Sequence, residues 1–548
     1  DRLSIGSLFD ELRALLDVGY YEKLLKTLLL DNPHRACVQL RPSKTLGAER
    51  QAQEQARLAA CVQGWTDAQR REIQALQASL EAWQHAPDSR EALASIPQVT
   101  LSQISAEPEE IPAEPAPDCA LPAVQHVINT GGIVYVNLYF DVDGLPEACI
   151  EDVSLLTSLL GQLGTAQLSM QELQKKLRLL TGGFQSGFSV YAGVNETQRS
   201  KLRVTVGFSA LEGKLQEAAE LACAILTETE LSDHAEILNL LRQQREELYQ
   251  SISTSTSFAL GRVAAACSQA DAYAERAGGL SFYRWLQKLE TNFESERGAL
   301  TKRLQTLARE IFSAGRLSFS TTGTFPGAPA LLGEIFSRRL TDAAWPYGTQ
   351  NRLQMLPPCR LGIQAATDVS YAVQGGALTQ FGGGYSGKMY AVSRIATLAY
   401  LWNVVRVQGG AYGTGLTLRN SGLAACTSYR DPTAARSLEL YEKTAQFLRQ
   451  FAQEGQPLDS YLIGALSRYM PLLTPSLKGC ISDIRALQGV TREMLRTSIA
   501  QILSLTHEDI LACCDSLEKT IAEGSVVVIG GKKQLEACGT RLDEIVVL

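Results

Sequence analysis

The sequence predicts an α+β protein in which one α/β unit occurs twice, after a pair of helices. Three observations lead to this prediction. Residues 46 to 86 are rich in Gln, Glu, Ala, Arg and Leu at helical spacing, and from residue 119 onward strand-like and helix-like patterns alternate. In addition, TGGFQSGFSV and QGGAYGTGLT align through their glycine pairs, Gly182–Gly183 and Gly409–Gly410, at an offset of 409 minus 182, or 227 residues. Both pairs follow a predicted helix and precede two strand-like runs and an amphipathic helix, which indicates an internal repeat.

The N-terminal part is predicted to be helical and then extended. The opening stretch LSIGSLFDELRALLDVGYYEKLLKTLLL is helical until Pro33 ends it, and RACVQLRPS alternates like a short strand. ERQAQEQARLAACVQGW and REIQALQASLEAWQ predict two antiparallel helices. SAEPEEIPAEPAPDCALP, residues 105 to 122, is rich in Pro and Glu and predicts an extended, solvated linker.

The first α/β unit begins with the strand GGIVYVNLYFDVDG, followed by the helix GLPEACIEDVSLLTSLLGQL, which Pro146 opens. GGFQSGFSVYAGVN and KLRVTVGFSAL predict two strands, and LEGKLQEAAELACAIL predicts a helix. One long helix is expected over DHAEILNLLRQQREELYQSISTSTSFALGRVAAACS and another over about residues 290 to 314. GRLSFSTTG is the next strand, and we expect the second unit to begin there.

The second unit repeats this alternation. It contains the helix PALLGEIFSRRL, the strand CRLGIQAATDVSYAV, the helix KMYAVSRIATLAYLWNVVRV, the glycine-rich stretch, the strand LAACTSYRD and the helix TAARSLELYEKTAQFLRQF. Further helices follow. The chain then ends with the strand SVVVIGG, the helix KKQLEACGTRL and a last strand, DEIVVL.

Composition and charge exclude several classes of protein. A net charge of -7 and a pI near 5.6 give no basic surface for nucleic acid or for an anionic membrane, and no run reaches the eighteen apolar residues of a spanning helix. The twelve cysteines are widely spaced and form no CxxC motif, so we expect buried thiols in a reducing compartment. The sequence begins at Asp1 within a helical pattern and without Met, so it is expected to be part of a longer protein.

Common catalytic and nucleotide motifs are missing or incomplete. The five histidines are at least 41 residues apart and form neither HExxH nor HxxEH, so we expect no catalytic metal site in this chain. GGGYSGKM fits GxxxxGK from Gly382 to Lys388, but Met389 stands where a phosphate loop has Ser or Thr. A glycine loop leading into the helix from Lys388 to Arg406 is the preferred interpretation. No GxSxG elbow is present.

The stretch RVQGGAYGTG, from Arg406 to Gly415, contains four glycines, one arginine and one tyrosine. Glycine pairs before an apolar run usually mark a turn into a strand, because the backbone there needs positive φ or a close approach. The same turn can also present Arg406 and Tyr412 to a ligand. The residues alone leave both interpretations open.

The repeated α/β unit, the helical hairpin before it and RVQGGAYGTG together resemble the C-terminal half of the pitrilysin/insulinase-type zinc metallopeptidases, which carry an inverted HxxEH motif. The hairpin resembles the presequence-protease branch most. By this resemblance, residues 1–42 are the end of a preceding catalytic-half domain, 43–118 a helical hairpin and Pro/Glu-rich linker, 119–314 domain three and 315–548 domain four. Domains three and four are then expected to be homologous α/β sandwiches with a mixed, largely antiparallel sheet.

The resemblance also implies a division of labour. In this family four such domains form two bowls around a closed chamber, and the N-terminal bowl holds the zinc ligands and the glutamate base. In this chain Ser154 to Ser158, SLLTS, align with the inverted motif and cannot replace two imidazoles and a carboxylate, so the segment is expected to be an ordinary amphipathic packing helix. Arg406 and Tyr412 would contact substrate and the developing oxyanion, and Gly409, Gly410 and Ala411 would pass close to the peptide.

The resemblance therefore predicts the C-terminal, non-zinc-binding half of a zinc metalloendopeptidase that degrades unfolded peptides, inactive as this chain alone. Its zinc would be bound by the absent N-terminal half, and its location would be a bacterial cytoplasm or, as the second option, an organelle matrix. The alternative is a non-catalytic scaffold or partner subunit of the same superfamily. A third possibility is a nucleotide-dependent protein that uses Gly382 to Lys388.

Overall fold

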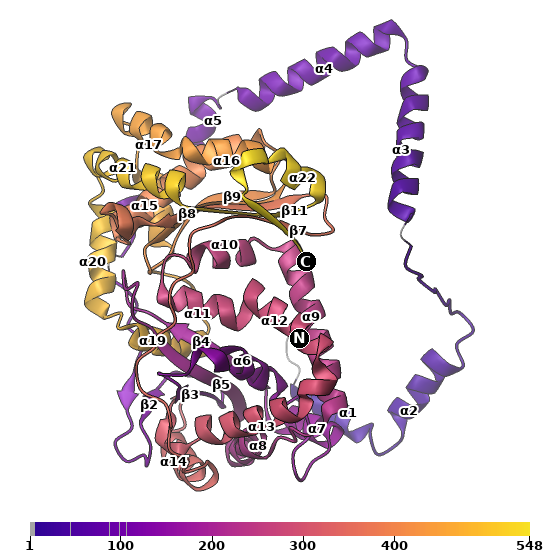
Figure 1. Ribbon diagram of the computed structural model, residues 1–548, viewed down its shortest axis with the longest axis vertical. Coiled ribbons are helices and arrows are strands. Elements are labelled where there is room, and N and C mark those ends of the chain that lie inside the picture. The colour runs from indigo at the N-terminus through magenta and orange to yellow at the C-terminus, as the bar shows by residue number, and fades with distance from the viewer. Residues whose placement is uncertain (1–5, 44, 87, 98, 106) are drawn as a thin grey trace. The chain divides into compact units, whose positions relative to one another are not determined.

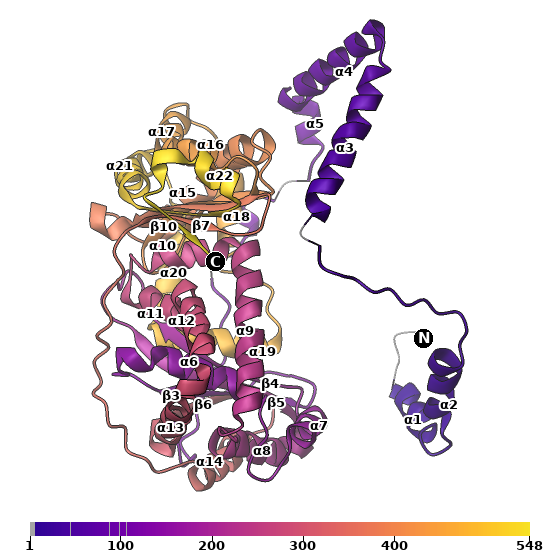
Figure 2. The same ribbon diagram turned by 45° about the vertical axis from the view of Figure 1, so that its right-hand side comes forward.

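A computed structural model describes residues 6–43, 45–86, 88–97, 99–105 and 107–548 (Figures 1 and 2). The chain divides into two compact units, Asp1–Gln98 and Val99–Leu548. No helix within the described ranges is long and apolar enough to span a membrane.

The first unit is helical. Its elements are α1 (Gly6–Ala14), α2 (Tyr20–Leu25), the π-helical turn η1 (Lys26–Leu30), α3 (Leu46–Gln63), α4 (Asp67–His85) and α5 (Arg90–Ala94). Thr66 and Gln69 form a capping box that starts α4. The strand expected at residues 35 to 43 is wrong: this segment is extended but pairs with no other described strand. An alternating pattern indicates a strand only where a partner supplies the ladder of hydrogen bonds.

The second unit contains two six-stranded sheets. The first has the order β1-β2-β6-β3-β5-β4 and the second the order β12-β7-β11-β8-β10-β9. The strands of the first sheet are β1 (Glu114–Pro115), β2 (Ala123–His126), β3 (Ile133–Asp141), β4 (Gly183–Tyr191), β5 (Lys201–Leu211) and β6 (Leu317–Thr322). Those of the second sheet are β7 (Arg360–Gln364), β8 (Ser370–Ala377), β9 (Gly413–Leu418), β10 (Leu423–Asp431), β11 (Ser525–Gly530) and β12 (Glu544–Val547).

The two sheets repeat one topology, which confirms the duplication that the glycine pairs indicate. Strands β4-β5-β3-β6-β2 correspond in order to β9-β10-β8-β11-β7. In both series each pair is antiparallel except the last, β2 with β6 and β7 with β11, which is parallel. The sheets differ only at the outermost strand, since β1 runs antiparallel to β2 and β12 runs parallel to β7. The fold is therefore α+β with two mixed, largely antiparallel sheets, as predicted.

Helices follow each sheet. Those of the first half are η3 (Glu147–Cys149), α6 (Ile150–Leu159), α7 (Met170–Leu180), α8 (Leu215–Glu228), α9 (His234–Thr254), α10 (Thr256–Ala264), α11 (Gln269–Gly278), α12 (Leu280–Thr291), α13 (Phe293–Ile311) and α14 (Ala328–Arg339). Those of the second half are α15 (Gly387–Ile395), the π-helix η7 (Ala396–Val407), α16 (Ala434–Glu442), α17 (Thr444–Gln453), α18 (Asp459–Leu466), α19 (Pro475–Gln488), α20 (Arg492–Leu503), α21 (His507–Glu523) and α22 (Lys532–Ala537). The single long helix expected from residue 233 is broken at Ser255, which is extended and caps the next helix by accepting from the backbone N–H of Ser257.

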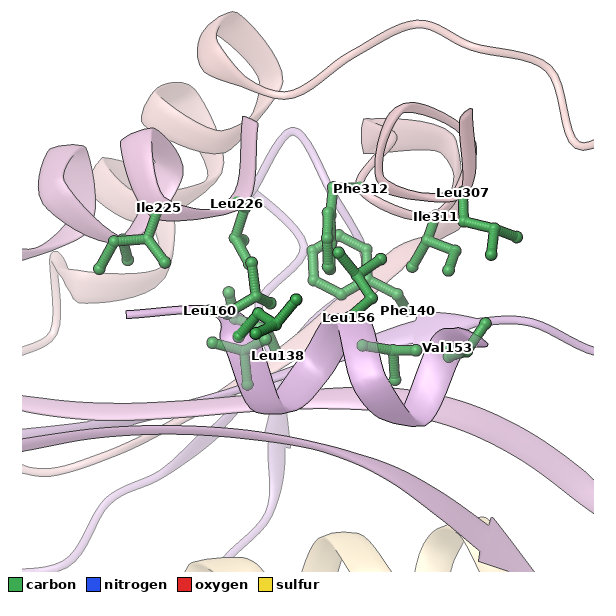
Figure 3. Packing of buried hydrophobic residues seen from close by; sticks show 14 of the residues in the cluster. Leu138, Phe140, Val153, Leu156, Leu160, Ile225, Leu226, Leu307, Ile311 and Phe312 are labelled. Atoms are coloured by element: carbon green, nitrogen blue, oxygen red, sulfur yellow. The ribbon is translucent and has the colours of Figure 1, made fainter. Parts of the chain in front are cut away.

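One face of the first sheet packs on a layer of helices and forms an apolar core (Figure 3). Leu138 and Phe140 of β3 point into this layer, where α6 contributes Val153 and Leu156. Phe140 meets Phe312 edge to face with ring centroids 5.1 Å apart. This alternation along β3 is the pattern from which the strand was predicted.

The predicted boundary after residue 314 is too early. β6 was expected to open the second unit, yet it lies between β2 and β3 at the centre of the first sheet. The chain leaves this half only after α14, and the second sheet begins with β7. A strand pattern shows that a strand exists but does not show which neighbours it pairs with, so this return was not readable from the sequence.

Each half places a helix on the free face of the other half's sheet. α10 packs on β8, β10 and β11, on the face opposite α16 and α22 (Figure 1), through an apolar cluster that includes Ala259, Val263 and Val527. α19 packs on β6 and β4, and this interface is polar. There the Asp483 carboxylate accepts hydrogen bonds from Tyr139 (2.8 Å), Ser320 (2.5 Å) and Asn137 (3.3 Å), and it pairs with His126 Nε2 at 2.9 Å.

The predicted linker is less solvated than expected. Its glutamates form ion pairs with α19 and α20: Glu109 with Lys478 of α19, and Glu107 and Glu110 with Arg496 and Arg492 of α20, respectively. Pro108 is buried, and β1 pairs with β2. The Pro112 carbonyl accepts a hydrogen bond from His126 Nδ1 at 2.7 Å. Proline and glutamate predicted the extended backbone correctly, but the basic partners lie far away in the sequence, at separations of 369, 382 and 389 residues.

The cysteines are all free, and two of them contradict the expectation of buried thiols. Cys37 and Cys61, both in the first unit, are exposed, whereas the remaining ten are buried or half-buried. The first unit has no buried residue among those described in α1 to α3, so it offers no core in which such thiols can be enclosed.

We expect Gly479→Ala to destabilise the second unit by about 1–3 kcal/mol, because the new methyl group overfills a closed contact. A Cβ at Gly479 would lie 2.0 Å from Thr322 Oγ1 and 3.2 Å from His126 Cδ2, and neither residue has room to move, since both are buried. Thermal unfolding of the variant checks this. Gly464→Ala on α18 is the matched control, because a Cβ there meets nothing within 4 Å. Equal melting temperatures for the two variants would contradict the close approach.

Candidate functional site

The RVQGGAYGTG stretch forms the turn between η7 and β9. Gly410 has φ of +81°, and a Cβ on Gly409 would lie 2.4 Å from the Val405 carbonyl oxygen. Two backbone hydrogen bonds close the turn, from Gly410 N to Arg406 O (2.9 Å) and from Ala411 N to Val405 O (3.2 Å). Both glycines are therefore required by the backbone, in agreement with the turn interpretation.

Tyr412 projects from this turn into solvent. Its side chain is 68% exposed, while its backbone N–H donates to Tyr429 O at 3.0 Å and its ring meets the Tyr429 ring edge with centroids 5.9 Å apart. The phenol hydroxyl has no hydrogen-bond partner among the described residues. The turn and the ring contact thus hold in place a phenol that is free to donate to a ligand.

Arg406 lies at the end of η7, half-buried. Its guanidinium stacks on the Trp402 ring, 3.9 Å from the centroid, and it forms no ion pair within the described ranges. Such a cation–π contact stabilises by about 0.5–1 kcal/mol at an exposed site and restricts the guanidinium without neutralising it. The guanidinium therefore keeps its capacity for an anionic or carbonyl ligand.

The three other predicted residues differ in what they can offer. Gly410 is exposed and Gly409 is half-buried, so backbone at both is near the surface. Ala411 is buried at 3% exposure, and its methyl group packs in the second core instead of facing a ligand. Only its backbone can take part in binding.

Three residues of this site were missed in the sequence. Trp402 supports Arg406, Tyr429 supports Tyr412, and Arg430 lies over the Tyr429 ring at 5.5 Å. Arg430 is exposed and has φ of +48°, at a register shift in β10. A non-glycine residue held in this strained region is often found at a functional site. Trp402 could have been found from its spacing four residues before Arg406 on a helix, whereas nothing local marks Tyr429 and Arg430.

The segment aligned with the zinc motif is a packing helix. Ser154, Thr157 and Ser158 in α6 use their hydroxyls on backbone carbonyls of the same helix, and Ser158 also donates to Gln244. The prediction of an amphipathic helix is wrong in one respect: α6 is buried on all sides except at Ser158. No group of three His, Cys, Asp or Glu side chains able to hold a metal ion occurs in the part of the chain that the structure describes.

The acidic residues of α6 explain how a helix this buried carries charge. Arg276 makes a fork contact with Glu151 (2.6 Å), and Arg303 pairs with Asp152 (2.7 Å). Burial without such partners would cost far more than the pairs do. These carboxylates are engaged in structure and are not available as a general base.

The glycine-rich GGGYSGKM segment is a loop that leads into α15, as preferred. Ser386 caps α15 by accepting from Met389 N, and Lys388 Nζ pairs with Asp509 at 2.6 Å. The lysine that a phosphate loop would aim at a nucleotide is thus turned to a carboxylate of α21.

Comparisons with known proteins agree with this architecture. The family model for the region associated with M16 peptidases of subfamily C matches residues 40–289, and the model of the "PreP C-terminal domain" matches residues 363–532. The chain belongs to the pitrilysin-like peptidase family. It corresponds to the C-terminal half of such a peptidase, which confirms the resemblance seen in the sequence.

Relatives of this pitrilysin-like chain include Protein HypA of Clostridium perfringens, 26% identical over 537 residues, and presequence protease 1 of Arabidopsis thaliana, a chloroplast and mitochondrial protein, 24% identical over 523 residues. These alignments cover 96% and 94% of the chain but 54% and 48% of the relatives. The chain therefore spans about half the length of the curated relatives it matches.

Solved structures show the same fold at low identity. A peptidase M16 inactive domain from Pseudomonas fluorescens superposes with a TM-score of 0.53 at 14% identity, covering 77% of this chain and 98% of that one. A conserved protein from Enterococcus faecalis gives 0.54 at 12% identity, covering 77% and 99%. These pitrilysin-like neighbours support the fold class alone.

Proposed function

We propose that this chain is the half of a zinc metalloendopeptidase that binds no zinc itself and supplies Arg406 and Tyr412 to peptide held against the other half. The observation that carries the proposal is the turn at residues 406 to 412. It holds an unpaired guanidinium and a free phenol at the surface, which packing of the second core does not require.

The chemistry of these two groups suits an acyl-transfer site. A phenol donates one hydrogen bond and a guanidinium several, and both can stabilise negative charge that develops on a carbonyl oxygen. The glycines keep Cβ atoms away from the approaching substrate backbone. Zinc bound by the other half would supply the hydrolytic centre, whereas the residues of this chain would hold and orient the substrate.

The family also supports the domain assignment as a proposal. Residues 1–42 would be the tail of a preceding domain and 43–118 the connecting hairpin and linker, with domains three and four after it. The boundary between these two domains belongs after α14, in the segment before β7.

The proposal predicts that this chain alone neither retains zinc stoichiometrically nor cleaves an unstructured peptide. Together with the upstream half of its own polypeptide it should cleave such a peptide in a zinc-dependent manner. Metal analysis and cleavage assays on both preparations check this. Cleavage by the isolated chain would refute the division of labour, and a complete protein that neither binds zinc nor cleaves peptide would be the scaffold instead.

A further inference from the structure

A second candidate site lies between α19, α20 and the loops at residues 194, 385 and 468 to 471. It is a cavity of about 420 Å³ that shares no lining residue with the turn at Arg406 to Gly415. Its walls are largely apolar, and the apolar side chains that line it include Ile481, Ile484, Val490, Met494 and Leu495. This volume falls in the range of pockets that hold small ligands or short peptide segments.

The walls of the cavity are held together from both halves. Asn195 donates through Nδ2 to Tyr385 O (3.0 Å) and accepts from Tyr385 N (2.6 Å), and its own N–H donates to Asn420 O (2.7 Å). The Tyr385 and Tyr469 hydroxyls are hydrogen-bonded at 2.8 Å. The cavity is therefore built into the fold and does not depend on a single loose loop.

Two arginines line this cavity, and no Asp or Glu does so among the described residues. The Arg485 side chain forms no hydrogen bond or ion pair with the described residues, although it is half-buried. Burial lowers the pKa of Arg485, and the charge of Glu109 acts in the opposite direction. Glu109 is itself paired with Lys478, so it leaves the Arg485 guanidinium without a partner of its own.

Arg468 is the second cation. It lies over the Tyr390 ring at 4.9 Å and the Tyr385 ring at 5.9 Å, and its one polar contact is to Asn420 Oδ1 at 3.4 Å. Two guanidinium groups without a carboxylate, set in an apolar cavity, are complementary to a carboxylate that carries an apolar body.

Further polar groups in the wall favour a peptide over a plain alkyl chain. The Gln488 side chain has no partner among the described residues. Gln501 accepts from Gly387 N at 2.8 Å, which leaves its NH₂ group free to donate. Amide groups at the side of an apolar cavity can pair with a peptide backbone, whereas an alkyl chain would leave them without partners.

We propose that this cavity binds the carboxyl-terminal end of a short apolar peptide, whose carboxylate is held by Arg485 and Arg468. The choice of a peptide over another apolar carboxylate rests on the proposed function, whereas the choice of a carboxylate rests on the two arginines. The ligand would be a peptide with a free carboxyl terminus and apolar last residues, bound away from Arg406 and Tyr412.

The test measures calorimetric binding to the full 548-residue chain of N-acetyl-Leu-Phe as the free acid, of the same peptide as its carboxyl-terminal amide, and of decanoate. We expect the free acid to bind at least about tenfold more tightly than the amide, because a hydrogen-bonded charge is lost in the amide. Arg485→Gln should abolish this preference. Arg297→Gln, at an exposed arginine on α13, should leave it unchanged, with thermal unfolding as the check that both variants fold.

The outcomes separate the alternatives. No binding of any probe, or equal binding of acid and amide, overturns the proposal. Decanoate that binds more tightly than the peptide acid, with loss of binding in Arg485→Gln, overturns the peptide as ligand and identifies a fatty-acid site. Because no step of this test requires peptide cleavage, its failure would leave the role proposed for Arg406 and Tyr412 standing.

Discussion

Tyr412→Phe, made in a protein that contains both halves, should lower kcat for an unstructured peptide by about 10²–10³-fold. The substitution removes one hydroxyl and leaves the ring, so its contact with Tyr429 and the backbone of the turn should remain. The loss is expected in kcat because a donor aimed at developing charge acts more strongly in the transition state than on the bound substrate. Steady-state kinetics on a fluorogenic peptide, with the zinc content measured in parallel, gives the answer.

The matched control is Tyr461→Phe. Tyr461 lies on α18, where its ring meets Phe451 with centroids 5.7 Å apart, and its hydroxyl has no partner among the described residues. This variant also loses one phenol hydroxyl, and we expect unchanged kinetics. If Tyr412→Phe kept normal turnover, Tyr412 would be a surface residue of the turn and nothing more.

Regularity within a segment made much of the fold predictable. β3 alternates buried and partly exposed residues, and β11 is buried throughout, so both appear clearly in the sequence. The glycine pairs before β4 and β9 revealed the repeat because both edge strands begin at the same place in one topology. These features depend on short stretches of chain, which sequence patterns report well.

Pairings over long distances could not be predicted in the same way. β6 joins β2 and β3 at the centre of the first sheet, and α19 crosses from the second half to cover that sheet. Asp483 contacts partners 163 to 357 residues away along the chain. No local pattern records which distant surface a polar helix will meet, so both the boundary and the docked linker were misjudged.

The candidate site was predictable to a similar extent. Arg406 and Tyr412 stand out beside four glycines, and the turn requires those glycines for reasons of backbone geometry. Tyr429 and Arg430 lie on β10, and they reach the same place only because β10 pairs with β9. Cation–π and ring-edge contacts leave no mark in spacing across a strand pair, so these supports became visible only in the structure.

Asp483→Asn should loosen α19, with hydrogen exchange of its amides faster by at least about 100-fold. Asp483 accepts from Tyr139 and Ser320, both buried, and it pairs with buried His126, so the amide would leave a charge and several donors poorly matched. Removing one partner of a buried pair costs about 3–5 kcal/mol, and each 1.4 kcal/mol is tenfold in the opening equilibrium. Exchange measured by mass spectrometry over residues 475 to 488, against α13 as an internal reference, reports this opening.

The matched control is Asp515→Asn on α21. Its exposed carboxylate pairs with Arg449 at 2.6 Å, and a surface pair of this kind contributes about 0–1 kcal/mol. We expect little change in exchange at α19 from this variant. Equal exchange rates in the two variants would show that apolar contacts alone hold α19 on the sheet.

The pH dependence of this opening distinguishes the charge of His126 from simple packing. Burial would lower the pKa of His126, but the hydrogen bond and charge of Asp483 and the Pro112 carbonyl outweigh it and raise the pKa above its usual 6.5. Both ring nitrogens face acceptors, which favours the doubly protonated ring. Because the folded pKa is raised, the stabilisation is complete below pH 6.5 and is lost as the pH rises through the folded value. After correction for the intrinsic rate, α19 of the wild type should therefore open more readily in mild alkali, whereas Asp483→Asn should show almost no such dependence, because the carboxylate that raises the pKa is gone.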